Sequence, residues 1–259
     1  MKICRFAHSK LPSITYGMVD GSQIFSVEDI YNPNLKQNFN SEPFALSAVQ
    51  VLAPVTPSKI VCVGRNYADH AAELGNAVPS EPLLFLKAPS SIIAHGEAIE
   101  LPSASARVEH EGELAVVIGR RARRLTSAEN PFDYVLGYTC LNDVTARDLQ
   151  KRDVQFTRGK SFDTFCPVGP FIETEIATDA LTIETRVNGE TRQHANTRDM
   201  IFPVEDLIRY ISQHMTLEVG DVIATGTPAG VGKLSAGDTV EVEIEGIGTL
   251  CNKVQAAMP

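Results

Sequence analysis

The sequence predicts an α+β fold that is rich in β-strands. Short apolar runs recur along the chain between Gly, Pro, Asn and Asp residues, a pattern typical of strands and turns. Two such pairs of runs flank the turn signals Asp20-Gly21 and Asn188-Gly189, which favour β-hairpins. One longer stretch, residues 203–215, has the apolar spacing of a helix. With 259 residues, 43% of them hydrophobic, the chain is long enough to bury a sizeable core.

The composition argues against several classes of protein. A formal net charge of −9 disfavours binding to nucleic acid or to anionic membranes. No apolar run approaches the roughly 18 residues of a membrane span, and the first residues lack the apolar core of a signal peptide. The five cysteines are widely spaced and form no Cys-x-x-Cys pair, so we expect reduced thiols. We therefore expect a cytoplasmic protein without a nucleic-acid or membrane partner.

Residues 1–56 are expected to form a small N-terminal β-rich domain. It contains the hairpin predicted at 16–27, followed by a Pro- and Asn-rich turn at 32–34. Nothing in this part suggests chemistry. Residues 57–259 contain no repeat and no polar linker, so we expect them to form one larger domain.

The larger domain is expected to alternate strands with turns and short helices. The helix at 203–215 begins with Pro203, which suits a first turn. A glycine-containing loop at 226–234 lacks the residues of a phosphate-binding P-loop, so it is either an ordinary turn or an oxyanion-binding loop. Strands are predicted at 59–63, 83–87, 114–118, 134–141, 183–187, 222–225, 239–245 and 249–254.

Three glutamates precede the predicted strand at 114–118. Glu109, Glu111 and Glu113 are spaced two apart, so in a strand they would face the same side. Carboxylates crowded in this way repel each other unless a cation lies among them. A hard divalent cation such as Mg²⁺ or Mn²⁺ is a natural candidate, because it takes oxygen ligands. The alternative is a frayed strand end with hydrated carboxylates.

Asp143 stands where the strand at 134–141 meets a predicted helix. It could be a helix N-cap, a common role of Asp. It could instead supply a third oxygen ligand from a neighbouring strand end. Two glutamates and one aspartate would leave about three positions open on an octahedral ion. A chelating substrate needs such open positions.

Two further groups could take part in chemistry. His70 and Glu73 share a face of the short helix predicted at 68–75, and a carboxylate beside an imidazole makes it a better general base. The alternative is an incidental exposed pair. Lys160 could hold a substrate carboxylate or a developing enolate oxygen, or could be a solvated loop lysine. The turn-rich residues 75–82 could form a mobile lid.

Taken together, these motifs resemble the fumarylacetoacetate hydrolase family. The chain is most similar to the shorter members, which are acylpyruvase and oxaloacetate decarboxylase-like proteins and 2-hydroxyhepta-2,4-diene-1,7-dioate isomerases. It lacks the long N-terminal domain of fumarylacetoacetate hydrolase itself. The resemblance covers roughly residues 57–255 and rests on Gly-Arg-Asn-Tyr-Ala-Asp-His at 64–70, Phe-Leu-Lys at 85–87, Glu-His-Glu-Gly-Glu-Leu at 109–114, Asn-Asp-Val-Thr-Ala-Arg-Asp at 142–148 and Thr-Gly-Thr-Pro at 225–228.

The resemblance implies a fold and a set of site residues. The fold would be the family's mixed β-sheet roll with flanking helices, with residues 57–259 as the catalytic domain, usually in a homodimer. Glu111, Glu113 and Asp143 would bind Mg²⁺ or Mn²⁺, which leaves Glu109 outside the site. Further roles would be water activation by His70 and Glu73, substrate contact by Lys160, polar groups near the reacting carbonyl from Gln150 and Thr227, and a substrate carboxylate near Arg65.

The implied chemistry starts from a small 2-oxo or 2,4-dioxo acid. Such an acid can chelate the ion through its carboxylate and keto oxygens, which makes an enolate accessible. We expect a magnesium-dependent hydrolase that cleaves a C–C bond in a β-dicarbonyl acid of the acylpyruvate type. The alternative is a decarboxylase of the oxaloacetate type, or an isomerase of the 2-hydroxyhepta-2,4-diene-1,7-dioate type, on the same site. A metabolite-binding protein without turnover is a third possibility.

Overall fold

The computed structural model describes residues 1–31 and 42–257. Strands predominate and helices are few, so the predicted β-rich α+β fold is confirmed. The turn expected at 32–34 lies outside the described residues. Within them, no helix has the length and apolar character needed to cross a membrane.

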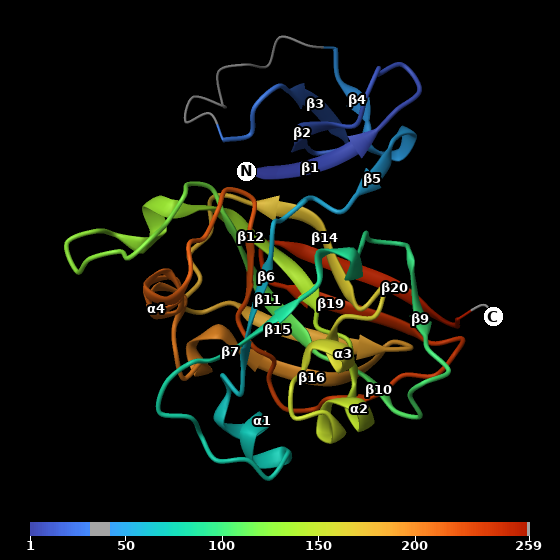
Figure 1. Cartoon of the computed structure of the whole chain (residues 1–259). Helices are drawn as coiled ribbons and strands as arrows, with labels where there is room; N and C mark the ends of the chain where they lie inside the picture. The colour runs from blue at the N-terminus through green and yellow to red at the C-terminus, as the bar shows by residue number, and fades with distance from the viewer. Residues whose placement is uncertain (32–41, 258–259) are drawn as a thin grey trace.

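A mixed sheet forms the centre of the molecule (Figure 1). Its strand β17 (Val222–Ala224) runs parallel to β6 (Ile60–Gly64), while β11 (Gly112–Ile118) and β12 (Val135–Asn142) pair antiparallel. Twelve strands belong to it within the described residues, along the path β4 (Phe44–Ala45), β3 (Gln23–Val27), β2 (Thr15–Asp20), β1 (Lys2–Ala7), β14 (Cys166–Glu173), β12 (Val135–Asn142), β11 (Gly112–Ile118), β17 (Val222–Ala224), β6 (Ile60–Gly64) and β7 (Leu83–Lys87), with β5 (Gln50–Leu52) on β1 and β8 (Ile92–Ile93) on β14.

Two smaller sheets complete the strand framework. The five-stranded sheet has the order β16 (Glu190–Asn196), β15 (Thr182–Val187), β19 (Thr239–Ile244), β20 (Gly248–Ala256) and β9 (Ala98–Leu101). The three-stranded sheet has the order β13 (Thr145–Ala146), β10 (Val108–His110) and β18 (Gly232–Lys233). The hairpins predicted at Asp20-Gly21 and Asn188-Gly189 are found as β2–β3 and β15–β16.

The helices are short and lie around the sheets. The α-helices of the described residues are α1 (Ala68–Glu73), α2 (Arg147–Arg152), α3 (Thr157–Lys160) and α4 (Val204–His214). Figure 1 shows α1, α2 and α3 in the half of the molecule that lies away from the N-terminal strands. Single 3₁₀ turns occur at Leu46–Ala48, Pro89–Ser91, Pro131–Tyr134 and Thr197–Asp199.

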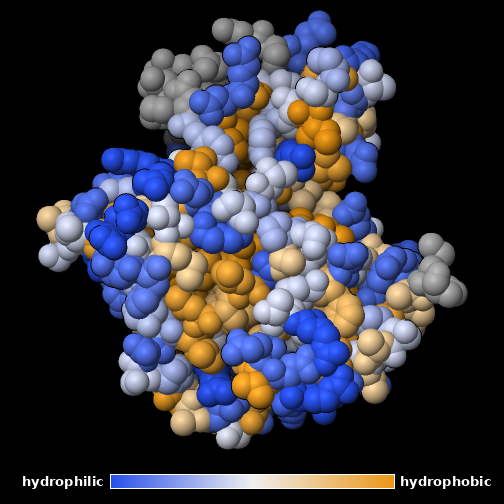
Figure 2. Space-filling model, viewed as in Figure 1, coloured by the Kyte–Doolittle hydropathy of each residue, from blue (hydrophilic) through white to orange (hydrophobic). Residues whose placement is uncertain are grey.

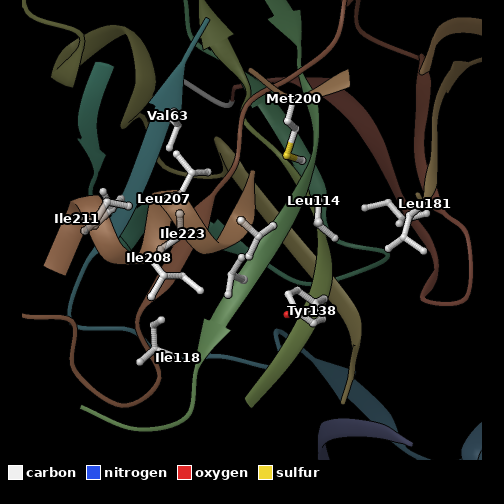
Figure 3. Packing of buried hydrophobic residues seen from close by; sticks show 14 of the residues in the cluster. Val63, Leu114, Ile118, Tyr138, Leu181, Met200, Leu207, Ile208, Ile211 and Ile223 are labelled. Atoms are coloured by element: carbon white, nitrogen blue, oxygen red, sulfur yellow. The ribbon is translucent and has the colours of Figure 1, made fainter. Parts of the chain in front are cut away.

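Strand β11 is buried on both faces, which explains its unbroken apolar sequence. Because side chains alternate along a strand, Leu114 and Ile118 join one core cluster and Val117 joins another. Figure 3 shows Leu207 and Ile208 of α4 packed among the residues of the first cluster. Burial of each such aliphatic side chain contributes about 1.5–3 kcal/mol. The core therefore holds rigidly the strand that leads out of the predicted carboxylate site.

The N-terminal strands form a lobe at the top of Figure 1. Strand β1 is also hydrogen-bonded to β14, with Lys2 opposite Glu173 and Ile3 opposite Ile172. The N-terminal strands thus continue the central sheet. The division of the chain into domains at residue 57 remains a prediction.

Asp221 joins the starting ends of β6 and β17, far from the end where β6 leads into α1. Its Oδ1 accepts hydrogen bonds from the Ser58 amide (3.0 Å), the Ser58 hydroxyl (2.7 Å) and the Lys59 amide (3.1 Å). Its Oδ2 accepts from the Glu218 amide (2.7 Å) and from the Lys59 ammonium group. Burial opposes ionisation, but these donors outweigh it and lower the pKa of Asp221.

We expect Asp221→Ala to lower the free energy of unfolding by about 3 kcal/mol at pH 7, because buried donors lose their acceptor. The pKa of this carboxyl is lower in the folded state. The contribution of this carboxyl to stability is therefore complete above its pKa in the unfolded chain, about 3.9. The contribution is lost as the pH falls through the lower pKa of the folded state. Urea unfolding at pH 7 and in acid measures both effects. A loss below about 1 kcal/mol at pH 7 would contradict this role.

Candidate metal centre and active site

The three predicted ligand carboxylates meet where β11 and β12 end. Asp143 directly follows β12, Glu111 lies between β10 and β11, and Glu113 belongs to β11. One oxygen from each lies within 4.8 Å of the others, and all three side chains are buried. They are therefore not the hydrated carboxylates of a frayed strand end.

The backbone around Glu111 explains this convergence. The Glu111 amide donates to Asn142 Oδ1 (2.9 Å), and the Glu111 carbonyl accepts from the Asp143 amide (2.8 Å). These bonds interrupt the strand at Glu111, so Glu109 belongs to β10 in a different sheet from Glu113. The expectation that Glu109, Glu111 and Glu113 share one strand face is therefore wrong. The alternative that Asp143 caps a helix is also wrong, because the N-cap of α2 is Ala146.

Buried cations alternate with the carboxylates. Asp143 accepts from Lys87 Nζ and Lys160 Nζ, both at 2.6 Å. Glu111 accepts from Lys160 Nζ at 2.6 Å and from Arg147. Lys160 ends α3 and its side chain is 2% exposed, so it is not a solvated loop residue. Lys87 and Arg147 are not among the site residues predicted from the sequence, although the charge of three buried carboxylates requires counterions.

Glu109 is satisfied outside this cluster. Its side chain is fully buried and is paired with Arg147 (2.6 Å to Nε) and with Arg107. This arrangement agrees with the position outside the metal site that the family resemblance implies. Arg147 therefore links Glu109 to Glu111, which fixes the orientation of both carboxylates.

Glu113 differs from its two neighbours. Its Oε2 accepts from the Gly226 amide (2.7 Å), but within the described part of the chain it has no ion pair. Burial, together with the charges of Asp143 and Glu111, raises the pKa of Glu113 well above its usual value. For Glu111, Lys160 and Arg147 outweigh burial and lower the pKa. One buried carboxylate thus lacks compensation, and a hard divalent cation suits this all-oxygen donor set.

Helix α1 places His70 beside Glu73, close to the carboxylate cluster. His70 is 5% exposed, and its Nδ1 lies 3.4 Å from Glu73 Oε2. Both Glu73 oxygens lie 3.2 Å from the Gly230 amide, which ties α1 to the loop after β17. The predicted pair is therefore in contact through Nδ1 of His70. Its role, and that of residues 75–82 as a lid, remain predictions.

A cavity of about 280 Å³ brings the predicted residues together. Its polar lining includes every predicted site residue except Glu73, which lies behind His70: Arg65, His70, Glu111, Glu113, Asp143, Gln150, Lys160 and Thr227. Arg147 lines the cavity too, and its guanidinium donates to Gln150 Oε1 (2.6 Å). Arg65 follows β6 with a positive φ of 58°, a strained backbone that is often found at functional sites.

An apolar wall faces these polar groups. Phe85 and Phe156 pack edge to face at 5.4 Å, and Lys160 Nζ lies 5.0 Å from the centre of the Phe85 ring. Leu83 continues the wall. Figure 2 shows hydrophobic side chains gathered on the face where Figure 1 draws β7. The cavity therefore combines a charged floor with an apolar side, as small-molecule sites commonly do.

Comparison with known proteins gives consistent matches. The family model described as fumarylacetoacetate (FAA) hydrolase C-terminal matches residues 59–255. Oxaloacetate tautomerase YisK of Bacillus subtilis is 46% identical over 226 residues, covering 82% of this chain and 75% of that protein. The mitochondrial oxaloacetate tautomerase Fahd2a of Rattus norvegicus is 47% identical over 220 residues, covering 80% of this chain and 70% of that protein.

Solved structures agree with these matches. The structure of 2-hydroxyhepta-2,4-diene-1,7-dioate isomerase from Mycobacterium marinum has a TM-score of 0.90 and 41% identity, with all of both chains covered. Maleylpyruvate hydrolase from Sphingobium sp. SYK-6, in complex with manganese (II) ion and pyruvate, has a TM-score of 0.84 and 30% identity over all of both chains.

Proposed function

The chain belongs to the fumarylacetoacetate hydrolase family, a family of enzymes, and on this premise we propose that it catalyses keto–enol tautomerisation of a small 2-oxo diacid such as oxaloacetate. The observation that carries the proposal is the buried cluster of Glu111, Glu113 and Asp143 beside Lys160. Two relatives that are 46% and 47% identical are named oxaloacetate tautomerases, which supports the choice of substrate.

We propose Mg²⁺ or Mn²⁺ as the cofactor, held by Glu111, Glu113 and Asp143. When bound, the cation would polarise the carboxylate and keto oxygens of the substrate. The ammonium group of Lys160 would stabilise the negative charge that develops on the 2-oxygen when the proton leaves carbon 3. Because Lys160 is buried against Phe85, its charge acts in a medium of low dielectric constant.

His70 is the proposed proton carrier. Its Nδ1 faces Glu73, so Nε2 can take the proton from carbon 3 of the keto form. The same proton, or one from water, then binds the 2-oxygen to give the enol. The reverse sequence converts enol to keto, with no net change in atoms or charge. Glu73 would hold the imidazole in place and stabilise its charged form.

Hydrolysis of a C–C bond in a 2,4-dioxo acid, the expectation from the sequence, is the second candidate. The contact between His70 and Glu73 favours it, since such a pair can also activate water. The maleylpyruvate hydrolase structure supports it as well. Decarboxylation of oxaloacetate and isomerisation of an unsaturated diacid would use the same charged floor of the cavity.

A substrate panel tests these alternatives. We expect the purified protein with Mg²⁺ or Mn²⁺ to accelerate decay of enol-oxaloacetate without releasing CO₂, and EDTA to abolish the activity. Ultraviolet absorbance follows the enol, while coupled assays follow CO₂ and pyruvate. Pyruvate from acetylpyruvate without tautomerase activity would favour the hydrolase, and CO₂ from oxaloacetate would favour the decarboxylase. Metal binding without turnover of any 2-oxo or 2,4-dioxo acid would identify a binding protein.

We expect His70→Ala to lower kcat by about 10²- to 10⁴-fold, because a positioned acid–base group contributes that much. Its affinity for Mg²⁺ should stay unchanged, since the imidazole is not among the proposed ligands. His214→Ala is the matched control, because His214 is exposed at the end of α4. Parental turnover by His70→Ala would contradict the proposed proton transfer.

We further propose that the enzyme is a homodimer, as the family resemblance implies, and that it is located in the cytoplasm, as its widely spaced cysteines indicate. Light scattering after size-exclusion chromatography should give twice the chain mass of 28.1 kDa. A mass equal to that of one chain would contradict the dimer.

A further inference from the structure

Gln193 lies on β16, in the five-stranded sheet, and its side chain is completely buried. Its Oε1 accepts from the Gly112 amide at 3.0 Å and lies 3.2 Å from His110 Nδ1. Its Nε2 donates to Thr227 Oγ1 and to the Pro228 carbonyl, both at 2.7 Å. All four hydrogen-bonding positions of the amide are therefore used within the protein.

These partners fix the direction of each hydrogen bond. The Gly112 amide can only donate and the Pro228 carbonyl can only accept, so the Gln193 amide has one possible orientation. The Thr227 hydroxyl must then accept from Gln193. The same hydroxyl lies 2.9 Å from the Gly112 carbonyl, to which it donates its proton. Thr227 consequently has no hydroxyl proton to offer a substrate.

The two segments joined by Gln193 both carry parts of the candidate active site. Gly112 lies between the proposed ligands Glu111 and Glu113. The loop after β17 holds Glu113 through the Gly226 amide and Glu73 through the Gly230 amide. A single buried amide therefore links the segment that carries two carboxylates to the loop that orients one of them and anchors α1.

The packing between β16 and the loop leaves little room for other arrangements. A Cβ atom on Gly230 would lie 2.0 Å from the carbonyl oxygen of Arg192, the residue before Gln193. A Cβ atom on Gly112 would lie 2.1 Å from Thr185 Oγ1. The loop, the segment at Gly112 and the five-stranded sheet are thus in close contact, and the Gln193 amide is hydrogen-bonded to both the loop and Gly112.

We propose that Gln193 is a positioning residue that aligns Glu113 with the other two carboxylates, and that Thr227 acts through this anchor instead of donating its hydroxyl proton to the substrate. The inference rests on the proposed function only for its metal and kinetic readouts. Gln193 does not line the cavity, so any effect of this residue on metal binding must pass through its hydrogen-bond partners His110, Gly112 and the loop that contains Thr227 and Pro228.

The test compares Gln193→Ala with Asn252→Ala. Asn252 is an equally buried amide that donates to the carbonyls of Ala94 and Glu97, both at 2.8 Å, away from the cavity. We expect Gln193→Ala to weaken Mg²⁺ binding in calorimetry by about 10- to 100-fold, as loss of a group that orients a ligand typically does. Asn252→Ala should keep the parental affinity for Mg²⁺, even if its Tm falls as far as that of Gln193→Ala.

A double-mutant cycle examines the role of Thr227. If Thr227 acts through Gln193, Gln193→Ala combined with Thr227→Val should bind Mg²⁺ and turn over substrate no worse than the weaker single variant. Fully additive losses would show an independent role of the Thr227 hydroxyl and overturn that part of the inference.

Hydrogen exchange provides a readout that needs neither metal nor turnover. In the metal-free protein, the amides of Gly226 and Gly230 should exchange faster in Gln193→Ala than in Asn252→Ala. If the two variants show the same exchange and the same Mg²⁺ affinity, the positioning role is wrong. If the parent protein neither binds Mg²⁺ nor acts on 2-oxo acids, the proposed function fails, and the exchange rates alone decide this inference.

Discussion

Asp143→Asn is expected to abolish measurable Mg²⁺ and Mn²⁺ binding and to lower kcat by about 10³-fold or more, since a bound cation supplies several kcal/mol of charge stabilisation. Asp143 is fully buried and pairs with both Lys87 and Lys160. The neutral amide has nearly the same shape, but it removes one of the three proposed ligand charges. It also leaves two buried ammonium groups with less compensation.

Calorimetry with each cation and steady-state kinetics measure these losses. Asp221→Asn serves as the control, because Asp221 is an equally buried aspartate at the opposite end of β6 and β17. It should lower stability while the metal affinity stays at the parental value. Unchanged Mg²⁺ affinity in Asp143→Asn would contradict the assignment of Asp143 as a ligand.

Glu113→Gln is expected to change stability in opposite directions with and without metal. Without metal, Glu113 is a buried carboxylate, and among the described residues only the Gly226 amide donates a hydrogen bond to it. Replacement by the neutral amide should raise the free energy of unfolding by about 1 kcal/mol. With a cation at 100 times its Kd, the parent protein should gain about 2.7 kcal/mol, and the variant should gain nothing.

The pH dependence of the metal-free protein follows from the same carboxyl. Burial and the neighbouring carboxylates raise the pKa of Glu113 in the folded state. The folded protein therefore binds more protons than the unfolded chain. The contribution of Glu113 to stability is complete below its pKa in the unfolded chain, about 4.3. It declines as the pH rises toward the higher pKa that Glu113 has in the folded state. Glu113→Gln should remove this decline.

Thermal or urea unfolding from pH 4 to pH 8, with EDTA and with Mg²⁺, measures both effects. Glu111→Gln is a suitable comparison, because Glu111 already pairs with Lys160 and Arg147. That variant should be destabilised with and without metal. Destabilisation of metal-free Glu113→Gln by a similar amount would show that Glu113 is already compensated in the absence of a cation.

Much of the framework follows from local sequence. Strand β11 is recognisable from its apolar run, the hairpins from Asp20-Gly21 and Asn188-Gly189, and α4 from its apolar spacing. These features depend on side-chain alternation, turn preference and helical period, which act within a few residues. The contact between His70 and Glu73 is predictable for the same reason.

The partners of the carboxylates could not be predicted in the same way. Lys87 lies 56 residues from Asp143 and Arg147 lies 36 residues from Glu111, so only the sheet register brings them together. The strand break at Glu111 also escapes local rules, because it depends on hydrogen bonds with Asn142 and Asp143. Lys87 and Arg147 both lie in motifs that carry the family resemblance, but the sequence does not show that they pair with these carboxylates.

The role of Gln193 also could not be predicted from local sequence. It follows the hairpin turn predicted at Asn188-Gly189, but its partner Gly112 is 81 residues away. A glutamine in a strand carries no sign of such a role, since most are exposed. Its importance becomes visible only when all four hydrogen bonds of its amide are known.

Diffraction from crystals grown with Mn²⁺ tests the central claim most directly, because anomalous scattering locates the ion independently of the protein atoms. We predict one peak within coordination distance of an oxygen from each of Glu111, Glu113 and Asp143. A map without this peak, in which Lys160 still bridges Glu111 and Asp143 at saturating Mn²⁺, would contradict the metal site and the function built on it.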